Sequence, residues 1–360
     1  MLRVYLCILI TIIALEVHSE QNVKPLSWNG FVTVEDIYNA RGGIKRGSVQ
    51  DAAVQVRGVY DTEIAKLWSG GQFTFGFFGF SQSHNQSLYT GAIQEPSNLS
   101  ADNNKIIRPY LSYQQKFNNI TTARAGIIDL NDYFNVTDTA SKLLNDSFAI
   151  SPTLIENSPI ATDPYPGYGT IVEIQGEHLG GQLGLFQGNP QHLDTVFHNG
   201  SMLIGEINAH FTPSSQKNTP EFILKVGGWR YHQSNAEIGN TNNGVYITTE
   251  SIWQNCDDQK RGIFLQLSAN PQNINAVPYS LGGGYTANAI FASRPKDVFS
   301  LGFSRIWING SPRETIFEIN YAIQIIDNLS LTPDLQYVVK PSGVYRNAFV
   351  GIIRLSYVFG

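Results

Sequence analysis

Apolar and polar side chains alternate along short stretches throughout this sequence, as they do in β-strands with one apolar and one polar face. The clearest stretch runs from Glu314 to Gln324. One parity carries Thr315, Phe317, Ile319, Tyr321 and Ile323, whereas the other carries Glu314, Glu318, Asn320 and Gln324. After Asp327-Asn328 the alternation resumes with Leu331, Leu335, Tyr337 and Val339 against Thr332, Asp334 and Gln336. Together the two stretches predict a β-hairpin with a short turn.

The same alternation recurs along the whole chain and predicts about sixteen strands. They begin near Phe31, Ala53, Phe73, Ile107, Thr121, Thr170, Gln182, Met202, Phe222, Val245, Ile263, Tyr285, Phe299, Glu314, Leu331 and Phe349. The connections at 116–119, 178–181 and 327–328 are brief, whereas their neighbours are longer. An even strand number with short turns on one side and longer loops on the other is typical of bacterial membrane barrels.

A membrane helix needs about eighteen continuous apolar residues, and no segment after Ser19 provides them. A transmembrane strand needs only about ten residues, because one face contacts lipid and the other contacts a water-filled lumen. We therefore predict an all-β fold, a transmembrane antiparallel β-barrel of about sixteen strands. A soluble β-sandwich, such as an adhesin or a lectin-like protein, uses the same alternation and stays open as an alternative.

The start of the chain predicts export. Met1-Leu2-Arg3 precede an apolar run that ends at Val17-His18-Ser19, which is typical of a secretory signal peptide over residues 1–19. Residues 20–360 then form a single barrel domain. The net charge of −5 and the absence of a basic cluster argue against a nucleic-acid partner. We expect the mature chain in the outer membrane of a Gram-negative bacterium, with the membrane lipids as partners.

Several motifs appear in order in the C-terminal third. They are Gly283-Gly284-Tyr285, Arg294-Pro295-Lys296-Asp297, Gly302, Glu318 with Asn320-Tyr321, and the run from Thr332 to Tyr337. Weaker echoes lie at Arg41-Gly42-Gly43, Arg124-Ala125-Gly126 and Gly228-Trp229-Arg230-Tyr231. In this ordered set the chain resembles the OprB-type carbohydrate-selective porins. The resemblance implies a channel for passive diffusion of small sugars, with no cofactor, and leaves a homo-oligomer open.

Two long connections, from Ser81 to Lys105 and from Asp129 to Gly167, are expected to carry function. The second follows the fifth strand. The resemblance to porins implies that it folds into the barrel as a constriction loop, whereas a mobile surface loop is the alternative. The candidate solute contacts within it are Asp129, Asp132, Tyr133 and Phe134.

Charged residues on the polar parity are candidates for the solute path through the lumen. Carboxylates accept hydrogen bonds from sugar hydroxyls, guanidinium groups donate to sugar oxygens, and an aromatic face can cover the C–H side of a sugar ring. The candidates are Arg57, Arg108, Arg124, Glu173, Glu206, Lys225, Glu250, Glu318, Asp334 and Arg354, with Trp229 as a stacking surface. For each of them the alternative is pairing with an opposite charge on a neighbouring strand, which holds the barrel's shape.

The sequence gives little support for an enzyme or a metal site. His192, Asp194 and His198 cluster, but a zinc site needs further matching ligands, so we interpret them as an ordinary polar loop. No Gly-x-Ser-x-Gly motif is present. A general porin or a porin for organic acids remains the alternative to sugar selectivity.

Overall fold

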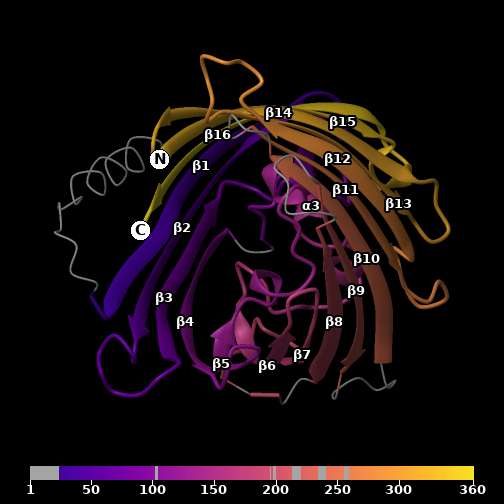
Figure 1. Cartoon of the computed structure of the whole chain (residues 1–360). Coiled ribbons are helices and arrows are strands. Elements are labelled where there is room, and N and C mark those ends of the chain that lie inside the picture. The colour runs from indigo at the N-terminus through magenta and orange to yellow at the C-terminus, as the bar shows by residue number, and fades with distance from the viewer. Residues whose placement is uncertain are drawn as a thin grey trace.

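Sixteen β-strands close into one antiparallel barrel in the part of the chain that the structure describes (Figure 1). This computed structural model describes residues 24–101, 104–194, 196–197, 200–212, 220–233, 241–254 and 259–360. Each strand pairs with the next one in sequence, and β1 pairs with β16 to close the ring. The strands are β1 (Leu26–Gly43), β2 (Gly47–Asp61), β3 (Gly71–Gln82), β4 (Lys105–Lys116), β5 (Thr121–Ile128), β6 (Gly167–Gln175), β7 (Leu179–Gln187), β8 (Ser201–Phe211), β9 (Glu221–His232), β10 (Thr241–Gln254), β11 (Lys260–Ala269), β12 (Tyr279–Asn288), β13 (Val298–Trp307), β14 (Glu314–Ile326), β15 (Leu329–Val339) and β16 (Arg346–Phe359). The predicted strand number and order are therefore confirmed.

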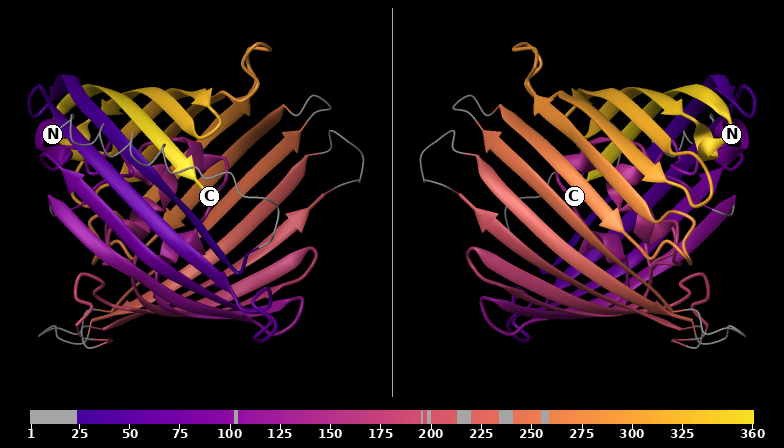
Figure 2. Two further views of the ribbon diagram at one scale, coloured as in Figure 1. Left: turned by 90° about the vertical axis from the view of Figure 1, so that its left-hand side faces the viewer. Right: turned by 90° about the vertical axis from the view of Figure 1, so that its right-hand side faces the viewer.

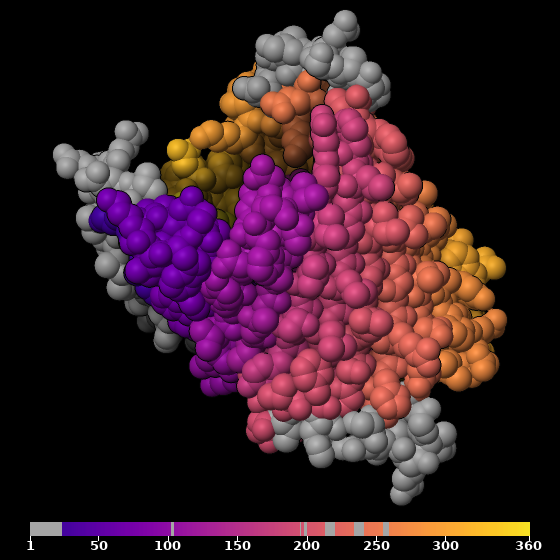
Figure 3. Space-filling view, turned by 60° about the horizontal axis from the view of Figure 1, so that its bottom comes forward, coloured from indigo at the N-terminus to yellow at the C-terminus, as the bar shows by residue number. Residues whose placement is uncertain are grey.

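The two faces of the wall differ in polarity as the alternation predicts. Phe317 is 50% exposed on the outside of the barrel, whereas the next residue, Glu318, is 3% exposed and faces the interior. Large apolar side chains cover the outer face all around the ring, for example Ile107, Leu111 and Ile207. Figure 3 shows the neighbouring strands as one continuous outer surface. A closed wall satisfies every strand's backbone hydrogen bonds and leaves no open edge, as lipid requires.

The connections at the two rims differ in length. The turns at 117–120, 176–178 and 327–328 are short, whereas the connections at 83–104 and 129–166, at the other rim, are the longest. The alternation of short turns and long loops is imperfect. The connection at 44–46 is short although it lies on the long-loop rim, and the connection at 62–70 is longer although it lies on the short-turn rim. Figure 2 shows the strongly tilted strands that run between the rims.

The longest connection, loop 129–166, lies inside the barrel (Figure 1). It contains the short helices η1 (Leu130–Asp132), η2 (Ala140–Lys142), α3 (Asp146–Ala149) and α4 (Pro152–Ile155). Leu130, Phe134 and Leu154 of this loop are completely buried, because they pack on the inner wall. The in-folding loop expected between the fifth and sixth strands is thus confirmed.

Loop 83–104 also turns inward, which the sequence did not reveal. It contains α2 (Ser87–Thr90), and its Gln94 and Ser97 are each at most 1% exposed. Two loops from the same rim therefore share the interior. One further short helix, η3 (Pro341–Gly343), lies between β15 and β16.

The structure describes the C-terminal strand but not the N-terminal segment. The signal peptide predicted at residues 1–19 lies outside the described residues. Tyr357, near the end of β16, is only 2% exposed because it packs in a cluster with Val32 and stacks on Phe359. No helix among the described residues is long and apolar enough to cross a membrane.

Candidate functional site

A cavity of about 990 Å³ lies inside the barrel, between the two inward loops and the wall. Gln55 and Phe31 contribute to it from the wall, and the remaining lining comes mainly from the loops. Its carboxylates are Glu95, Asp129, Asp132, Asp146, Glu156 and Asp163, and no lysine or arginine is among its lining residues. A solute in this cavity is therefore surrounded by hydrogen-bond acceptors.

Arg57 of β2 joins the wall to loop 129–166 at the edge of this cavity. Its Nη1 lies 2.7 Å from Oδ2 of Asp132, and its guanidinium lies 4.3 Å from the ring centre of Tyr110. Its Nε and Nη2 are buried and have no hydrogen-bond partner among the described residues. The Tyr110 hydroxyl donates to Asp163, and Gln55 Nε2 donates to the same carboxylate over 3.2 Å. Donors, acceptors and an aromatic ring thus meet at one point.

Arg124 of β5 makes a similar arrangement three strands further along. Its Nη1 lies 2.6 Å from Oε2 of Glu173 on β6, and its guanidinium lies 4.8 Å from the ring centre of Tyr133. Arg108 of β4 stacks on Tyr165 at 5.3 Å and donates to the Gln191 carbonyl over 2.7 Å. The structure therefore brings Arg57, Arg108 and Arg124 to one side of the lumen, each beside a tyrosine.

Burial perturbs the carboxyl groups of the loop. It raises the pKa of Asp129 to about 7, and the nearby charge of Asp132 adds to this shift. Burial also raises the pKa of Asp163, with a further contribution from the charge of Asp129. The number of negative charges in the cavity therefore grows as the pH rises through neutrality.

Three wall carboxylates on the lumen face hold the backbone of loop 129–166. Oε2 of Glu206 accepts from the Asn135 N–H at 2.9 Å, and Oε2 of Glu250 accepts from the N–H and the hydroxyl of Thr139 at 3.0 and 2.9 Å. Glu318 accepts from the N–H groups of Leu144 and Asn145 (2.6 and 3.0 Å). All three carboxylates are less than 5% exposed, so they serve as anchors for the loop.

The remaining lumen candidates also contact the loops or the wall. Lys225 Nζ donates to the Val136 carbonyl over 2.5 Å. Arg354 pairs with Glu35 on the neighbouring β1 over 2.7 Å and donates to loop 83–104 at Ser97 and Asn98. Asp334 is 2% exposed and accepts from Gln336 on its own strand. None of these three faces the cavity between the loops.

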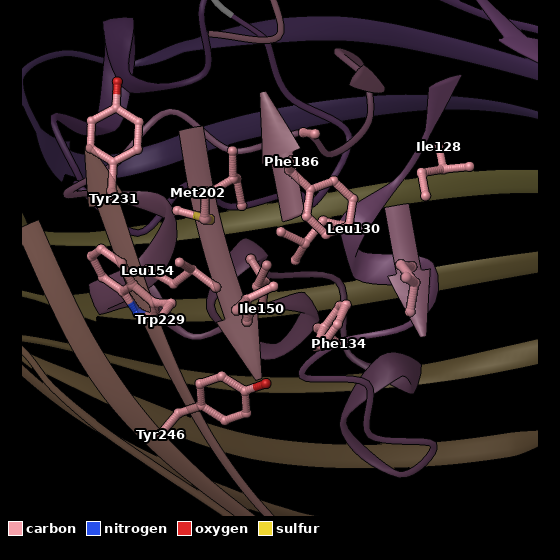
Figure 4. Close-up of a cluster of buried hydrophobic side chains, with 14 residues drawn as sticks. Ile128, Leu130, Phe134, Ile150, Leu154, Phe186, Met202, Trp229, Tyr231 and Tyr246 are labelled. Atoms are coloured by element: carbon pink, nitrogen blue, oxygen red, sulfur yellow. The ribbon is translucent and has the colours of Figure 1, made fainter. Parts of the chain in front are cut away.

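Phe134 and Trp229 have a different environment from the one expected of solute contacts. They belong to an apolar cluster in which loop residues such as Leu154 pack against wall residues (Figure 4). Phe134 is 0% and Trp229 4% exposed, so neither ring presents a face to a passing solute. Trp229 does lie on the lumen side of its strand, but the loop covers it. The prediction that Phe134 and Trp229 contact the solute is therefore corrected, because both rings pack in the apolar cluster between the loop and the wall.

Glycines on the inner wall make room for loop 129–166. A Cβ on Gly302 would lie 2.5 Å from Leu143 Cδ1, and one on Gly262 would lie 2.5 Å from Thr139 Oγ1. Both distances are shorter than carbon and oxygen atoms tolerate, so the loop's position depends on the missing side chains. Gly302 was one of the residues that carried the family resemblance.

Sequence reasoning missed several residues of the site. Gln55 and Tyr110 lie on the lumen parity next to the predicted Arg57 and Arg108, so the alternation contained a signal for them. Glu314, which accepts from the Ile93 and Gln94 N–H groups over 3.0 and 2.8 Å, was seen only as a polar-parity residue. Asp163 gave no signal, because the sequence does not show which loop carboxylates meet the wall.

The described residues contain no group of three or more His, Cys, Asp or Glu side chains that could hold a metal ion. His198, one of three residues considered for zinc, lies outside the described residues. His192 and Asp194 are described, and their nearest ring nitrogen and carboxylate oxygen are 4.0 Å apart.

Comparisons with known proteins agree with this architecture. The family model described as "Carbohydrate-selective porin, OprB family" matches residues 53–359. Porin B of Pseudomonas aeruginosa is 25% identical over 143 residues, which is 31% of this chain and only 32% of that relative's length.

Solved structures are similar over nearly the whole chain. The high-pH structure of Pseudomonas putida OprB has a TM-score of 0.81 at 15% identity and covers 93% of this chain and 94% of that one. The low-pH structure of the same protein has a TM-score of 0.61 at 14% identity, with 93% of both chains covered. A mutant of the Rh. blastica porin has a TM-score of 0.56 at 11% identity and covers 93% of this chain and 100% of that one. At these identities the likeness concerns the fold.

Proposed function

Because the chain belongs to the carbohydrate-selective porin, OprB family, we propose that it is a non-enzymatic outer-membrane channel through which small sugars diffuse passively. The closed barrel and the family both place the protein in the outer membrane of a Gram-negative bacterium. The proposal includes export by a signal peptide at residues 1–19, which N-terminal sequencing of the membrane-inserted protein tests.

The observation that carries the proposal is the composition of the constriction beside Arg57. Arg57 and Asp132 place a donor and an acceptor 2.7 Å apart with their side chains 19% and 37% exposed, whereas the Tyr110 ring beside them is buried. A sugar offers the matching groups, because its hydroxyls both donate and accept. These contacts compensate for lost hydration without a strong charge interaction, so the solute binds weakly enough to leave.

The acidic lining of the cavity also bears on the choice of solute. The lining residues include six carboxyl groups and no lysine or arginine, so every charge that the lining residues carry is negative and repels organic acids, whereas an uncharged sugar is not repelled. This observation supports sugars over organic acids. The paired charges at Arg57 and Asp132 support a preference for hydroxyl-rich solutes over other neutral ones.

A liposome-swelling assay with solutes of similar size tests the proposal. Proteoliposomes carrying the protein are placed in a hexose, a neutral amino acid or the anion of a sugar acid, and swelling rates are compared. We expect the hexose to enter fastest and the anion slowest. Rates that follow size alone would identify a general porin, and fastest entry of the anion would identify a porin for organic acids.

The variant Asp132→Asn shows whether the constriction sets the preference. We expect the ratio of hexose to amino-acid entry to fall by up to about fivefold, the effect of a partly exposed ion pair. Asp327→Asn is the matched control, since Asp327 lies in a short turn at the far rim and, among the residues that the structure describes, forms an ion pair with Lys296 alone. An unchanged ratio of hexose to amino-acid entry in Asp132→Asn would show that Asp132 does not contact the solute.

A further inference from the structure

The outer wall carries an apolar groove of about 410 Å³ on strands β10 to β13. Among its lining residues are Ile247, Leu267, Ala269, Tyr279, Leu281 and Trp307. The groove lies near the rim of the long loops, because β11 ends at Ala269 and β12 begins at Tyr279 on that side. It is separate from the lumen, whose side chains point to the other face of the same strands.

The strand register places two arginines beside this groove. Tyr279 lies opposite Ala269 on one side and opposite Trp307 on the other, and Leu281 lies opposite Arg305. Arg305 therefore stands in the row of outward-facing residues directly next to the apolar lining. Arg313, in the connection that follows β13, has its guanidinium 5.5 Å from the ring centre of Trp307.

Neither arginine is neutralised within the described part of the chain. Arg305 is half-buried, and its Nε donates to the uncharged hydroxyl of Thr315 over 2.9 Å. Arg313 is exposed, and no carboxylate among the described residues lies within ion-pair distance of either guanidinium. Two positive charges next to an apolar groove match a ligand with an anionic head and an apolar chain.

The connections at the rim next to the groove also carry positive charge. The connections at 308–313, 340–345 and 44–46 contain Arg313, Lys340, Lys45 and Arg46 and no aspartate or glutamate. Basic pockets on membrane proteins bind anionic lipid head groups, and tryptophan prefers the depth where head groups and chains meet. Trp307 lines the groove, lies two residues closer to this rim than Arg305, and has the Arg313 guanidinium 5.5 Å from its ring centre.

We propose that this groove binds one acyl chain of a phosphorylated glycolipid of the outer leaflet, while Arg305 and Arg313 hold a phosphate of its head group. The guanidinium fork donates two parallel hydrogen bonds to phosphate oxygens, and a phosphate monoester without a balancing ammonium group attracts the two arginines more strongly than the phosphodiester of a zwitterionic lipid does. The lipid can bind here when the rim of the long loops faces the outside of the cell. Its binding does not depend on which solute crosses the lumen.

Native mass spectrometry of the purified full chain tests the site. The protein is mixed in detergent with equal amounts of diphosphorylated lipid A and phosphatidylethanolamine. We expect one lipid A to remain bound to each wild-type chain. The double variant Arg305→Gln/Arg313→Gln is expected to retain at least about tenfold less, because two charge-assisted contacts are lost.

Two further variants make the test specific. Ala269→Trp fills the apolar groove and leaves both arginines in place, and it is expected to release lipid A as well. Arg261→Gln is the matched control, because Arg261 is an exposed outward-facing arginine at the opposite end of β11, and its lipid retention is expected to stay at the wild-type level.

The proposal is overturned if the double variant retains lipid A as the wild type does, if Ala269→Trp has no effect, or if the wild type retains phosphatidylethanolamine equally well. Every variant is first checked for the heat-modifiable migration of a folded barrel. Sugar entry into liposomes is expected to be unchanged in all of them, since none of these residues lines the lumen, so failure here is distinguishable from failure of the proposed transport.

Discussion

Replacing Glu318 with glutamine removes one of the acceptors that hold loop 129–166 to the wall. In the native barrel Oε1 of Glu318 accepts from the Leu144 N–H and from Asn320 Nδ2, at 2.6 and 3.0 Å. Oε2 accepts from the Asn145 N–H at 3.0 Å. Glutamine offers only one oxygen, so its new NH₂ group faces the Asn145 N–H, and that donor loses its acceptor. A hydrogen bond to a charged group contributes about 1.5–3 kcal/mol, which corresponds to about 10- to 150-fold in the local opening equilibrium.

Hydrogen exchange followed by mass spectrometry measures this effect directly. In peptides that cover residues 140–150 of the Glu318→Gln variant, the amides around Asn145 should exchange about 10 to 150 times faster than in the wild type. Glu173→Gln is the matched control, because Glu173 pairs with Arg124 on the neighbouring strand and accepts no hydrogen bond from a loop backbone in the described part of the chain. Unchanged exchange in Glu318→Gln, or equal acceleration in both variants, would refute the anchoring role.

Other perturbations test the packing and the charge of the interior. Gly302→Ala places a Cβ 2.5 Å from Leu143 and should destabilise the barrel by about 1–3 kcal/mol, seen as a lower thermal midpoint, whereas Gly282→Ala, with 3.5 Å of clearance, should change little. Since the pKa of Asp129 is about 7, its carboxyl is neutral well below that pH and ionised above it. Cation preference, measured as the reversal potential in a KCl gradient, should therefore rise between pH 5 and pH 9 and should rise less in Asp129→Asn. Asp132→Asn should shift the same potential toward anions, because Arg57 then keeps its charge without a counter-charge, and a shift toward cations would contradict the assignment.

The barrel wall could be predicted from the sequence because each strand carries its own signal. Alternation with a period of two is a local property, and a lipid face opposite a wet lumen enforces it residue by residue. Phe317 and Glu318, neighbours in the chain, therefore ended on opposite sides of the wall as predicted.

The role of most lumen charges could not be predicted, because it depends on contacts between distant parts of the chain. Glu250 meets Thr139 across 111 residues, and Glu318 meets Leu144 across 174. The polar parity shows that such carboxylates face the interior, but not that a loop will lie on them. Trp229 illustrates the same limit, since its lumen-facing position followed from the alternation and its burial followed from the loop that covers it.

We propose that sugars cross the lumen at the constriction where Arg57 and Asp132 meet. Single-channel current in a planar bilayer tests it, with a hexose added at increasing concentration. We expect brief interruptions of the ionic current that become more frequent with hexose and that shorten in Asp132→Asn. A current that hexose leaves uninterrupted in the wild type, or interruptions with the same duration in the variant, would contradict it.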